Sequence, residues 1–455
     1  MSQRGRHRSS PARLAAFEAL FQVATKDAYA NLALNQVLSK HRMDAQQSAV
    51  CTELVNGTAR LLGTYDRVLE TAGGRPLSSL QPAVVTVLRL TTHELLSMRT
   101  PTHAAVDAGV ELARDAVGQR VTGVVNAIAR KVAAHDLDEW VTLLSEAAPD
   151  PVDALATATH HPRWITEVYA DLLGDEARTA LEANNVAPVP TLVVRPGLVE
   201  RDQVDAPDAT PTTFSPFGLH RAGNPSDLRE VRRGQVGVQD EGSQLMAWLA
   251  SLAPTSRDAA GLPWLDLCAG PGGKAALLTG LARQRDTWLL AGERAPHRAD
   301  LVRKALSAYQ DGWAVVAADG TRPAWQPGSF GRVMADVPCT GLGSLRRRPE
   351  SRWRRTTDDL DELVALQRQL IDAAWRSVAP GGVLAYVTCS PHPAETIDQV
   401  RAFLDRTPGA ELLDAPALLP DVPGAGHPGD ARMVQLWPHR HRTDAMFGAL
   451  LRKPS

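Results

Sequence analysis

The sequence predicts an α/β protein, in which a doubly wound, seven-stranded and mostly parallel sheet follows an all-α domain and a small α+β subdomain. Two observations predict the sheet. From residue 262 onward, apolar strand-like runs alternate with helix-compatible runs, which is typical of βαβ units. The first run ends at Cys268 in a turn of small residues, and a helix-compatible run begins at Lys274. A strand, a glycine-rich turn and a helix in this order hold nucleotide-like ligands in α/β folds.

The individual elements of the sheet domain follow from hydrophobic periodicity and from turn residues. We expect strands at residues 264–268, 288–292, 314–318, 332–336, 382–388, 432–436 and 446–450. We expect helices at residues 274–282, 296–308, 357–378 and 393–404. Right-handed crossovers between parallel strands would bring the carboxyl ends of the strands to one edge, which is where ligands bind in such folds.

The N-terminal part of the chain, from residue 11 to about residue 135, is predicted to be helical. Leu14, Phe17 and Leu20 recur at helical spacing, and the breakers Gly73-Gly74 and Thr100-Pro101 separate later helical runs. We expect five to seven short helices between residue 11 and about residue 135. By itself, this pattern is also that of a generic helical bundle with an interaction role.

Four segments are predicted in the 455 residues. Residues 1–10 form a basic tail, which is either disordered and solvated or an arm that attracts phosphates. Residues 11–140 form the helical domain, residues 141–236 a small α+β linker subdomain, and residues 237–455 the sheet domain.

Composition narrows the class of protein. The net charge is -2, so global basicity does not indicate nucleic acid, although local basic patches can still bind it. The four cysteines form no CxxC pair, and His160 and His161 have no partners at ligand spacing, so we expect no metal and no disulfide. No apolar run is long enough to cross a membrane and the N-terminus is not a secretory signal. We therefore expect a cytoplasmic protein with reduced thiols.

Acidic residues follow successive predicted strands. Asp266 lies in the first strand, and Glu293 comes after the second, roughly 20 residues past the glycine turn, where a carboxylate binds a ribose diol. Asp319 follows the third strand and could accept a hydrogen bond from an adenine amino group. Asp336 ends the fourth strand. Each one alone could be a turn or cap residue, but four in register favour a nucleoside site.

Two cysteines complete this edge of the sheet. Cys339 follows Pro338 after the fourth strand, and Cys389 lies between Thr388 and Ser390 after the fifth. A thiol at such a position is a candidate nucleophile, because partial exposure and nearby cations favour the thiolate. A single cysteine at a strand end would more often belong to the core.

With these residues the sequence from about 237 to 451 resembles the Sun/Fmu-type RNA (cytosine-5) methyltransferases. The matching stretches are residues 266–274, 336–341 and 388–390 and the late run 439–444. The front domain resembles the NusB-like RNA-binding helical domain, through residues 12–20, 102–113 and 124–131. Two departures stand out: Gly270 replaces a more usual alanine, and Arg442 replaces a usual glycine.

The resemblance implies a function and a set of site residues. The enzyme would methylate C5 of a specific cytosine in 16S rRNA with S-adenosyl-L-methionine, acting as a monomer on RNA or on a small-subunit assembly intermediate. Cys389 would be the nucleophile, and Cys339 would release the product, with Asp336 and Lys274 assisting. The implied cofactor contacts are Cys268, Ala269, Gly270, Pro271, Gly272, Gly273, Lys274, Glu293, Asp319 and Asp336.

The chemistry explains why these residue types are needed. Attack of the Cys389 thiolate on C6 makes C5 of the cytosine enamine-like, so that C5 can accept a methyl group, while Asp336 stabilises charge on the ring. Cys339 would help to remove the C5 proton. The target base must be unpaired or turned out of its stack.

A basic run follows Cys339. Arg346, Arg347 and Arg348 are predicted phosphate contacts, with Trp353 as a stacking surface, although a solvated loop would also explain the charges. Two other functions are weighed against the leading one. A DNA cytosine-5 methyltransferase would use the Pro-Cys cysteine as nucleophile, and a non-catalytic RNA-binding assembly factor would keep the fold but transfer no methyl group.

Overall fold

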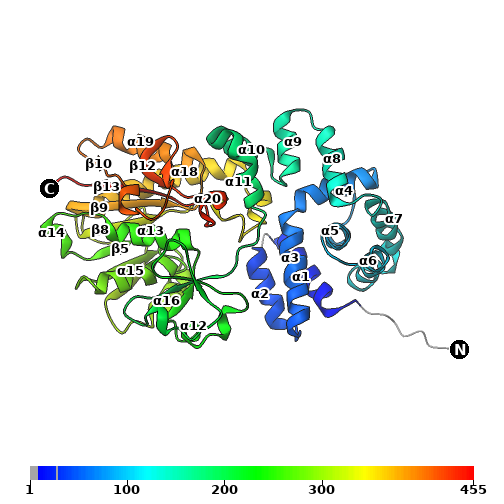
Figure 1. Ribbon diagram of the computed structural model, residues 1–455, viewed down its shortest axis with the longest axis horizontal. Coiled ribbons are helices and arrows are strands. Elements are labelled where there is room, and N and C mark those ends of the chain that lie inside the picture. Colours follow the sequence, from blue (N-terminus) through cyan, green and yellow to red (C-terminus); the bar gives the residue numbers. More distant parts are fainter. Residues whose placement is uncertain (1–8, 27–28) are drawn as a thin grey trace. The chain divides into compact units, whose positions relative to one another are not determined.

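The computed structural model describes residues 9–26 and 29–455. Residues 1–8, which make up most of the predicted basic tail, lie outside the described residues. The chain divides into two compact units (Figure 1). The helical unit comprises Met1–Asn185 together with Arg347–Arg354, and the sheet unit comprises Val186–Arg346 together with Arg355–Ser455.

The front of the helical unit contains seven α-helices. They are α1 (Pro11–Lys26), α2 (Ala30–Lys40), α3 (Ala45–Arg60), α4 (Leu62–Gly73), α5 (Pro82–Leu96), α6 (Thr102–Ala116) and α7 (Thr122–Val132). The predicted breakers act as expected: α4 is capped by Gly74 at φ 64°, and α6 begins directly after Pro101. Cys51 is fully buried among the apolar residues of this bundle.

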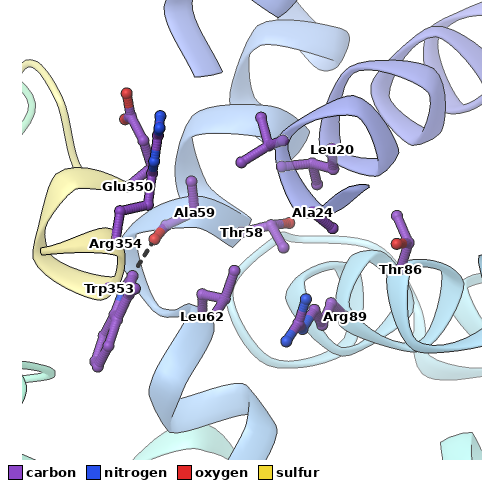
Figure 2. Close-up of a pocket in the computed structure, with 11 residues that line it drawn as sticks. Leu20, Ala24, Thr58, Ala59, Leu62, Thr86, Arg89, Glu350, Trp353 and Arg354 are labelled. Atoms are coloured by element: carbon purple, nitrogen blue, oxygen red, sulfur yellow. Dashed lines mark hydrogen bonds between the residues drawn. The ribbon is translucent and has the colours of Figure 1, made fainter. Parts of the chain in front are cut away.

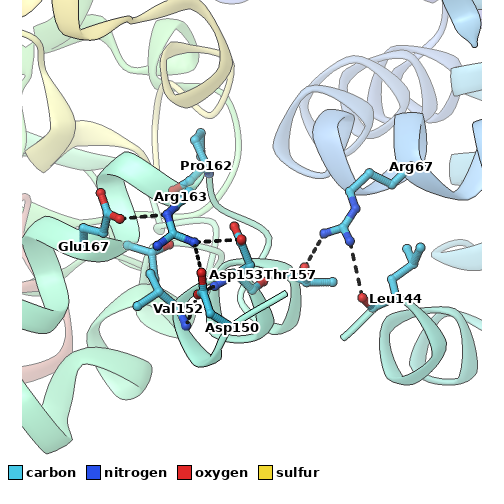
Figure 3. A network of polar contacts seen from close by, with 10 residues as sticks. Arg67, Leu144, Asp150, Val152, Asp153, Thr157, Pro162, Arg163 and Glu167 are labelled. Carbon is cyan, nitrogen blue, oxygen red and sulfur yellow. Dashed lines mark hydrogen bonds and ion pairs between the residues drawn. The ribbon is translucent and has the colours of Figure 1, made fainter. Parts of the chain in front are cut away.

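Four further helices extend the helical unit: α8 (Leu137–Glu146), α9 (Pro151–Ala158), α10 (Arg163–Leu173) and α11 (Ala177–Ala183). Arg163 joins the start of α10 to α9, because its Nη1 lies 2.5 Å from Asp150 and 2.7 Å from Asp153 (Figure 3). Arg67 of α4 donates to Thr157 of α9 and to the carbonyl of Leu144. These bonds connect α8, α9 and α10 to the bundle, and the compact helical unit extends to Asn185.

The segment Arg347–Arg354, which includes α17 (Ser351–Arg354), completes the helical unit. Trp353 donates its indole N–H to the carbonyl of Ala59 at 3.0 Å, beside a pocket that α1, α3, α5 and this segment line (Figure 2). The ring of Trp353 lies where a side chain on Gly63 would be, so only glycine fits at that position of α4.

The sheet unit begins with a small antiparallel sheet. Its strands are β1 (Thr191–Val194), β2 (Thr210–Pro211), β3 (Gly218–His220) and β4 (Val236–Val238), in the order β2-β3-β1-β4. Buried apolar side chains of β1, β3 and β4 form its core together with Leu228. The predicted α+β linker subdomain therefore contributes a small antiparallel sheet that begins at β1.

The large sheet contains nine strands among the described residues. The seven predicted strands are β5 (Trp264–Asp266), β6 (Leu289–Glu293), β7 (Trp313–Ala317), β8 (Phe330–Asp336), β9 (Val378–Thr388), β12 (Asp430–Gln435) and β13 (Phe447–Arg452). Two short strands, β10 (Glu411–Leu412) and β11 (Gly426–His427), are added. The order is β11-β12-β13-β9-β8-β5-β6-β7, with β10 beside β13.

Five of these strands, β7, β6, β5, β8 and β9, pair in parallel, and β13 pairs antiparallel to β9. Helices cover both faces, as predicted for a doubly wound sheet. One core cluster joins the sheet to α13 (Glu241–Leu252), α15 (Gly273–Arg283) and α16 (Pro296–Leu306). The other joins it to α18 (Thr357–Ser377) and α19 (Ile397–Arg406). No helix in the described part of the chain could span a membrane.

Candidate active site

The glycine-rich turn connects the end of β5 to the start of α15. Gly272 has φ 110°, which an L-residue rarely adopts, and a Cβ on it would lie 2.6 Å from Cβ of Ala305 and 3.1 Å from Cα of Val302. Glycine is therefore required at this position so that α16 can pack against the turn.

Gly270 is explained by the same kind of contact. Glu293 Oε2 occupies the space that a Cβ on Gly270 would take, and Arg298 Nη2 donates to the carbonyl of Gly270 at 2.9 Å. The departure from the more usual alanine thus matches the position of Glu293 and Arg298 in this chain.

Asp266 lies beneath the turn and is buried. Neither of its carboxylate oxygens receives a hydrogen bond of ordinary geometry from the described residues. Burial, together with the charge of Asp336, raises the pKa of Asp266 to about 7, and the ammonium of Lys274 offsets only part of this rise. The amide of Cys268 lowers the pKa of Asp266 slightly, but since neither oxygen has a hydrogen bond of ordinary geometry, a ligand's hydrogen-bond donors fit here.

Glu293 is the last residue of β6, and Asp319 follows the neighbouring parallel strand β7. Glu293 is buried and accepts from the amide of Ala295 at 2.9 Å. Asp319 is exposed, and hydrogen bonds from the amide and hydroxyl of Thr321, at 3.0 and 2.8 Å, lower its pKa. Both carboxylates lie at the carboxyl edge of the sheet, as predicted.

Lys274 forms an ion pair with Asp336, with Nζ 2.8 Å from Oδ2. Burial alone would lower the pKa of Lys274, but the charge of Asp336, their hydrogen bond and the nearby Cys389 raise it above its usual value. Lys274 therefore stays charged within the electrostatic reach of Cys389. The sequence could not place this cation beside the cysteine.

The two predicted cysteines lie together. Residues 336 and 387 are partners in the parallel β8–β9 pair. Cys389 directly follows β9, and Val337 and Pro338 separate the end of β8 from Cys339. Sγ of Cys339 lies 3.4 Å from Sγ of Cys389, and the hydrogen bond to Cys389, with burial, raises the pKa of Cys339 well above its usual value. Burial also raises the pKa of Cys268, which is consistent with a supporting role in the turn.

Glu395 is a buried residue of this site that the sequence did not single out. It accepts hydrogen bonds from the amide and the hydroxyl of Thr340, the residue that follows Cys339. In the sequence, Glu395 falls in the first turn of a predicted helix, where an acidic residue is expected without any function. No pattern in the sequence marked it.

The predicted phosphate contact at Arg346 is corrected by the structure. Arg346 is buried, and its Nη2 lies 3.3 Å from Asp240 Oδ2 and 3.8 Å from Asp444 Oδ1. A guanidinium held by two buried carboxylates is not available to RNA phosphates. Arg347 and Arg348 are exposed, and for them the prediction stays open.

Arg352 and Trp353, which come shortly after this basic run, also make packing contacts within the protein. Arg352 is fully buried in the helical unit, where it donates to the carbonyls of His160 and Asn184 and to Asn185. Trp353 is half-buried: it packs on Gly63 and donates to the carbonyl of Ala59, so part of its indole supports the bundle. Basic and aromatic residues close together in the sequence indicated a nucleic-acid-binding segment. In the structure, Arg352 and Trp353 make contacts inside the helical unit instead.

Arg442 has φ 58° and ψ 17° and ends α20 (Pro438–His441). This left-handed conformation is the one that favours glycine. The departure from the usual glycine is therefore accommodated without a change of backbone, at the cost of a strained arginine.

The described part of the chain, residues 9–26 and 29–455, contains no group of three or more His, Cys, Asp or Glu residues that could hold a metal ion. His161 is buried and its Nδ1 lies 2.6 Å from the carbonyl oxygen of Thr159. Nearby, Nδ1 of His160 lies 2.9 Å from the hydroxyl of Thr64.

Comparison with known proteins shows which family the chain belongs to. Residues 249–452 match the model of the family described as 16S rRNA methyltransferase RsmB/F, and residues 10–134 match the NusB family. A putative methyltransferase of Mycobacterium tuberculosis is 43% identical over 97% of this chain and 96% of its own length. The ribosomal RNA small subunit methyltransferase B of Vibrio cholerae is 30% identical over 97% of each chain.

The fold is also found among solved structures. The crystal structure of PH0851 aligns with a TM-score of 0.78 and 22% sequence identity, over 98% of this chain and 99% of that one. A doubly wound sheet with a glycine-rich turn and carboxylates at the ends of β6 and β7 defines an S-adenosylmethionine-dependent methyltransferase, here with a NusB domain in front. The chain belongs to the 16S rRNA methyltransferase RsmB/F family, and it is an rRNA methyltransferase.

Proposed function

We propose that the protein methylates C5 of a specific cytosine in 16S rRNA through a covalent bond between Cys389 and C6 of the base. The observation that carries the proposal is the cluster of Cys389, Cys339, Lys274 and Asp336 at one edge of the sheet. A thiol pair beside a charged lysine and a carboxylate suits attack on an electron-poor ring followed by proton removal.

The turn from Cys268 to Lys274 would hold S-adenosylmethionine. The buried oxygens of Asp266, which receive no hydrogen bond of ordinary geometry from the described residues, fit the donors of such a ligand, and Glu293 and Asp319 suit a ribose diol and an adenine amino group. Bound there, the cofactor supplies an electrophilic methyl group. Side chains of the protein carry out the other steps, which are attack on the base and removal of the C5 proton.

Cys389 begins the reaction. Its thiolate forms a bond to C6 of the cytosine, and the electron pair of the C5–C6 double bond shifts toward C5 and N3. Lys274 favours the thiolate by its charge, since the two groups interact electrostatically. Asp336 would accept a hydrogen bond from the N4 amino group at the N3/N4 edge of the base, while the ammonium of Lys274 beside it offsets the negative charge that develops on the ring.

Cys339 completes the reaction. In the resting protein its proton is held by the hydrogen bond to Cys389. Once Cys389 is bonded to carbon, that hydrogen bond is lost, so Cys339 can give its proton to water and then accept the C5 proton of the methylated base. The released electron pair restores the C5–C6 double bond and expels the Cys389 thiolate.

The substrate is proposed from the family and the NusB domain. The V. cholerae relative is named for the small-subunit ribosomal RNA, and a NusB domain is an RNA-binding module by resemblance. The exposed Arg347 and Arg348 would contact phosphates, and the target cytosine would be unpaired or flipped. We propose a monomer that works in the cytoplasm, on 16S rRNA or an assembly intermediate.

The test is to incubate the protein with unmodified 16S rRNA and methyl-labelled S-adenosylmethionine and to map the label. We expect one labelled cytosine, methylated at C5. Binding of the RNA without any transfer would favour the non-catalytic assembly factor, and label at a ring nitrogen or a ribose would overturn the proposed chemistry. Equal transfer to duplex DNA would favour the DNA-type enzyme.

A further inference from the structure

Glu395 is fully buried, and both oxygens of its carboxylate accept hydrogen bonds, three in all. Its Oε1 accepts from the amide of Thr340 at 2.7 Å and from Nε2 of Gln367 at 3.0 Å. Its Oε2 accepts from the hydroxyl of Thr340 at 2.5 Å. Short hydrogen bonds to a buried carboxylate are among the strongest in proteins, so this cluster is rigid.

The same cluster reaches the second cysteine turn. Because the hydroxyl hydrogen of Thr340 is given to the carboxylate, the 3.3 Å contact between Thr340 Oγ1 and Ser390 Oγ has Ser390 as its donor. Thr340 directly follows Cys339, and Ser390 directly follows Cys389. One hydrogen bond therefore links the residues next to the two thiols.

Gln367 holds the other side of the Cys339 turn. Its Nε2 donates to the carbonyl of Pro338 at 2.9 Å as well as to Glu395. Pro338 and Thr340 are thus both fixed by side chains from outside the turn, and Cys339 lies between them. These side-chain bonds add to the restraint that the fixed φ of Pro338 gives the turn.

We propose that Glu395 is a positioning residue that sets the separation of the Cys339 and Cys389 sulfur atoms, acting through Thr340 and Ser390. The proposal rests on the proposed function, in which both thiols act on one base in sequence. Proton transfer requires heavy atoms within hydrogen-bond reach, so a small displacement of Cys339 slows product release more than it slows cofactor binding.

The first experiment measures the sulfur separation without RNA or cofactor. Diamide oxidises neighbouring thiols: two S–H bonds break, an S–S bond forms, and the reagent takes up the two protons and two electrons. In the full-length protein, the rate of Cys339–Cys389 cross-linking is followed by mass spectrometry of peptides. Thr340→Val keeps the shape of the side chain but removes the hydroxyl, and should slow cross-linking by about tenfold.

Two variants control for unrelated effects. Thr340→Ser retains the hydroxyl and should restore the wild-type rate of cross-linking. Thr142→Val makes the same chemical change at an exposed threonine of α8, where the hydroxyl donates to the Asp138 carbonyl, and should leave the rate unchanged. Glu395→Gln removes the charge with little change of volume and should slow cross-linking in the same direction as Thr340→Val.

The second experiment measures turnover on 16S rRNA. For Thr340→Val and Glu395→Gln we expect kcat to fall by about tenfold with an unchanged KM for S-adenosylmethionine, and the covalent protein–RNA adduct to accumulate. A purely structural role would not favour the adduct. Thr340→Ser should again behave as wild type.

The outcomes separate the two proposals. Slower cross-linking together with lower kcat and more adduct supports the positioning role. Unchanged cross-linking in a folded Thr340→Val protein overturns it, and so does slower cross-linking with unchanged turnover. If the wild type transfers no methyl group to rRNA while cross-linking still depends on Thr340, the proposed function fails and the geometric role of Glu395 stands.

Discussion

Cys339 and Cys389 are 50 residues apart in the chain, and their sulfur atoms lie 3.4 Å apart. The parallel pairing of β8 with β9 produces this proximity, because it aligns the carboxyl ends of both strands. The hydrogen bond to Cys389, together with burial, raises the pKa of the Cys339 thiol well above its usual value. The different roles proposed for the two cysteines rest on this asymmetry.

Replacing each cysteine tests these roles. Cys389→Ala should abolish both methylation and the covalent adduct, because no thiolate remains to attack C6. Cys339→Ala should let an adduct accumulate on RNA, because proton removal from C5 is slowed. Denaturing gel electrophoresis with labelled RNA measures the adduct, and label transfer measures turnover.

Cys51→Ala supplies the control, since this thiol is buried in the helical unit. It should leave adduct formation and turnover as in the wild type. The reverse pattern, with no adduct in Cys339→Ala and a persistent adduct in Cys389→Ala, would show that the Pro-Cys cysteine is the nucleophile, as in DNA-type enzymes.

The exposed arginines give a second prediction. Changing both Arg347 and Arg348 to Ala should weaken RNA binding and lower the slope of log affinity against log salt by roughly 1.5, because two phosphate contacts are lost. Filter binding over a range of salt concentrations measures both quantities. Arg368 and Arg376, exposed on α18, provide a control double variant with the same change of charge.

Arg346 should respond differently. Arg346→Ala leaves Asp240 and Asp444 without their shared guanidinium, so we expect a loss of about 3 kcal/mol in the free energy of unfolding. Chemical denaturation measures it. An Arg346→Ala protein of unchanged stability with a reduced salt slope would restore the original assignment of Arg346 to RNA.

Arg442 gives a prediction about backbone strain. Arg442→Gly should raise the free energy of unfolding by up to about 1 kcal/mol, because glycine adopts φ 58° without the clash of a Cβ. The arginine side chain is exposed, so Arg442→Ala should stay close to wild type. Equal denaturation midpoints for all three proteins would mean that the left-handed turn carries no strain.

Asp266 predicts a dependence on pH. Its pKa of about 7 in the folded protein lies above the value of 3.8 for the unfolded chain, so its contribution to stability is complete below pH 3.8 and is lost as the pH rises through about 7. Relative to Asp266→Asn, the cofactor-free wild type should lose up to about 4 kcal/mol over that range. Parallel denaturation curves at each pH measure the difference, and a constant difference would contradict the raised pKa.

Much of the sheet unit could be predicted, because strand periodicity and the glycine turn are local signals. All seven predicted strands are present, and the carboxylates at the ends of β6 and β7 lie where they were expected. Arg346 and Arg352 could not be predicted, since their partners at 240, 444, 160 and 184 are distant in sequence. Charge in a sequence indicates exposure, and only tertiary packing reveals that a guanidinium is neutralised or enclosed. Glu395 could not be predicted either, because its hydrogen-bond partners Thr340 and Gln367 are also distant in sequence.

The membership of Arg347–Arg354 in the helical unit has a consequence for biosynthesis. The ribosome makes residues up to Asn185 first, and at that stage the surface around Ala59 and Gly63 still lacks Trp353, which is added well over a hundred residues later. The helical unit is thus discontinuous in the order of translation. It reaches its final packing only when most of the sheet unit has already left the exit tunnel, so an isolated front fragment exposes apolar surface that the whole protein covers.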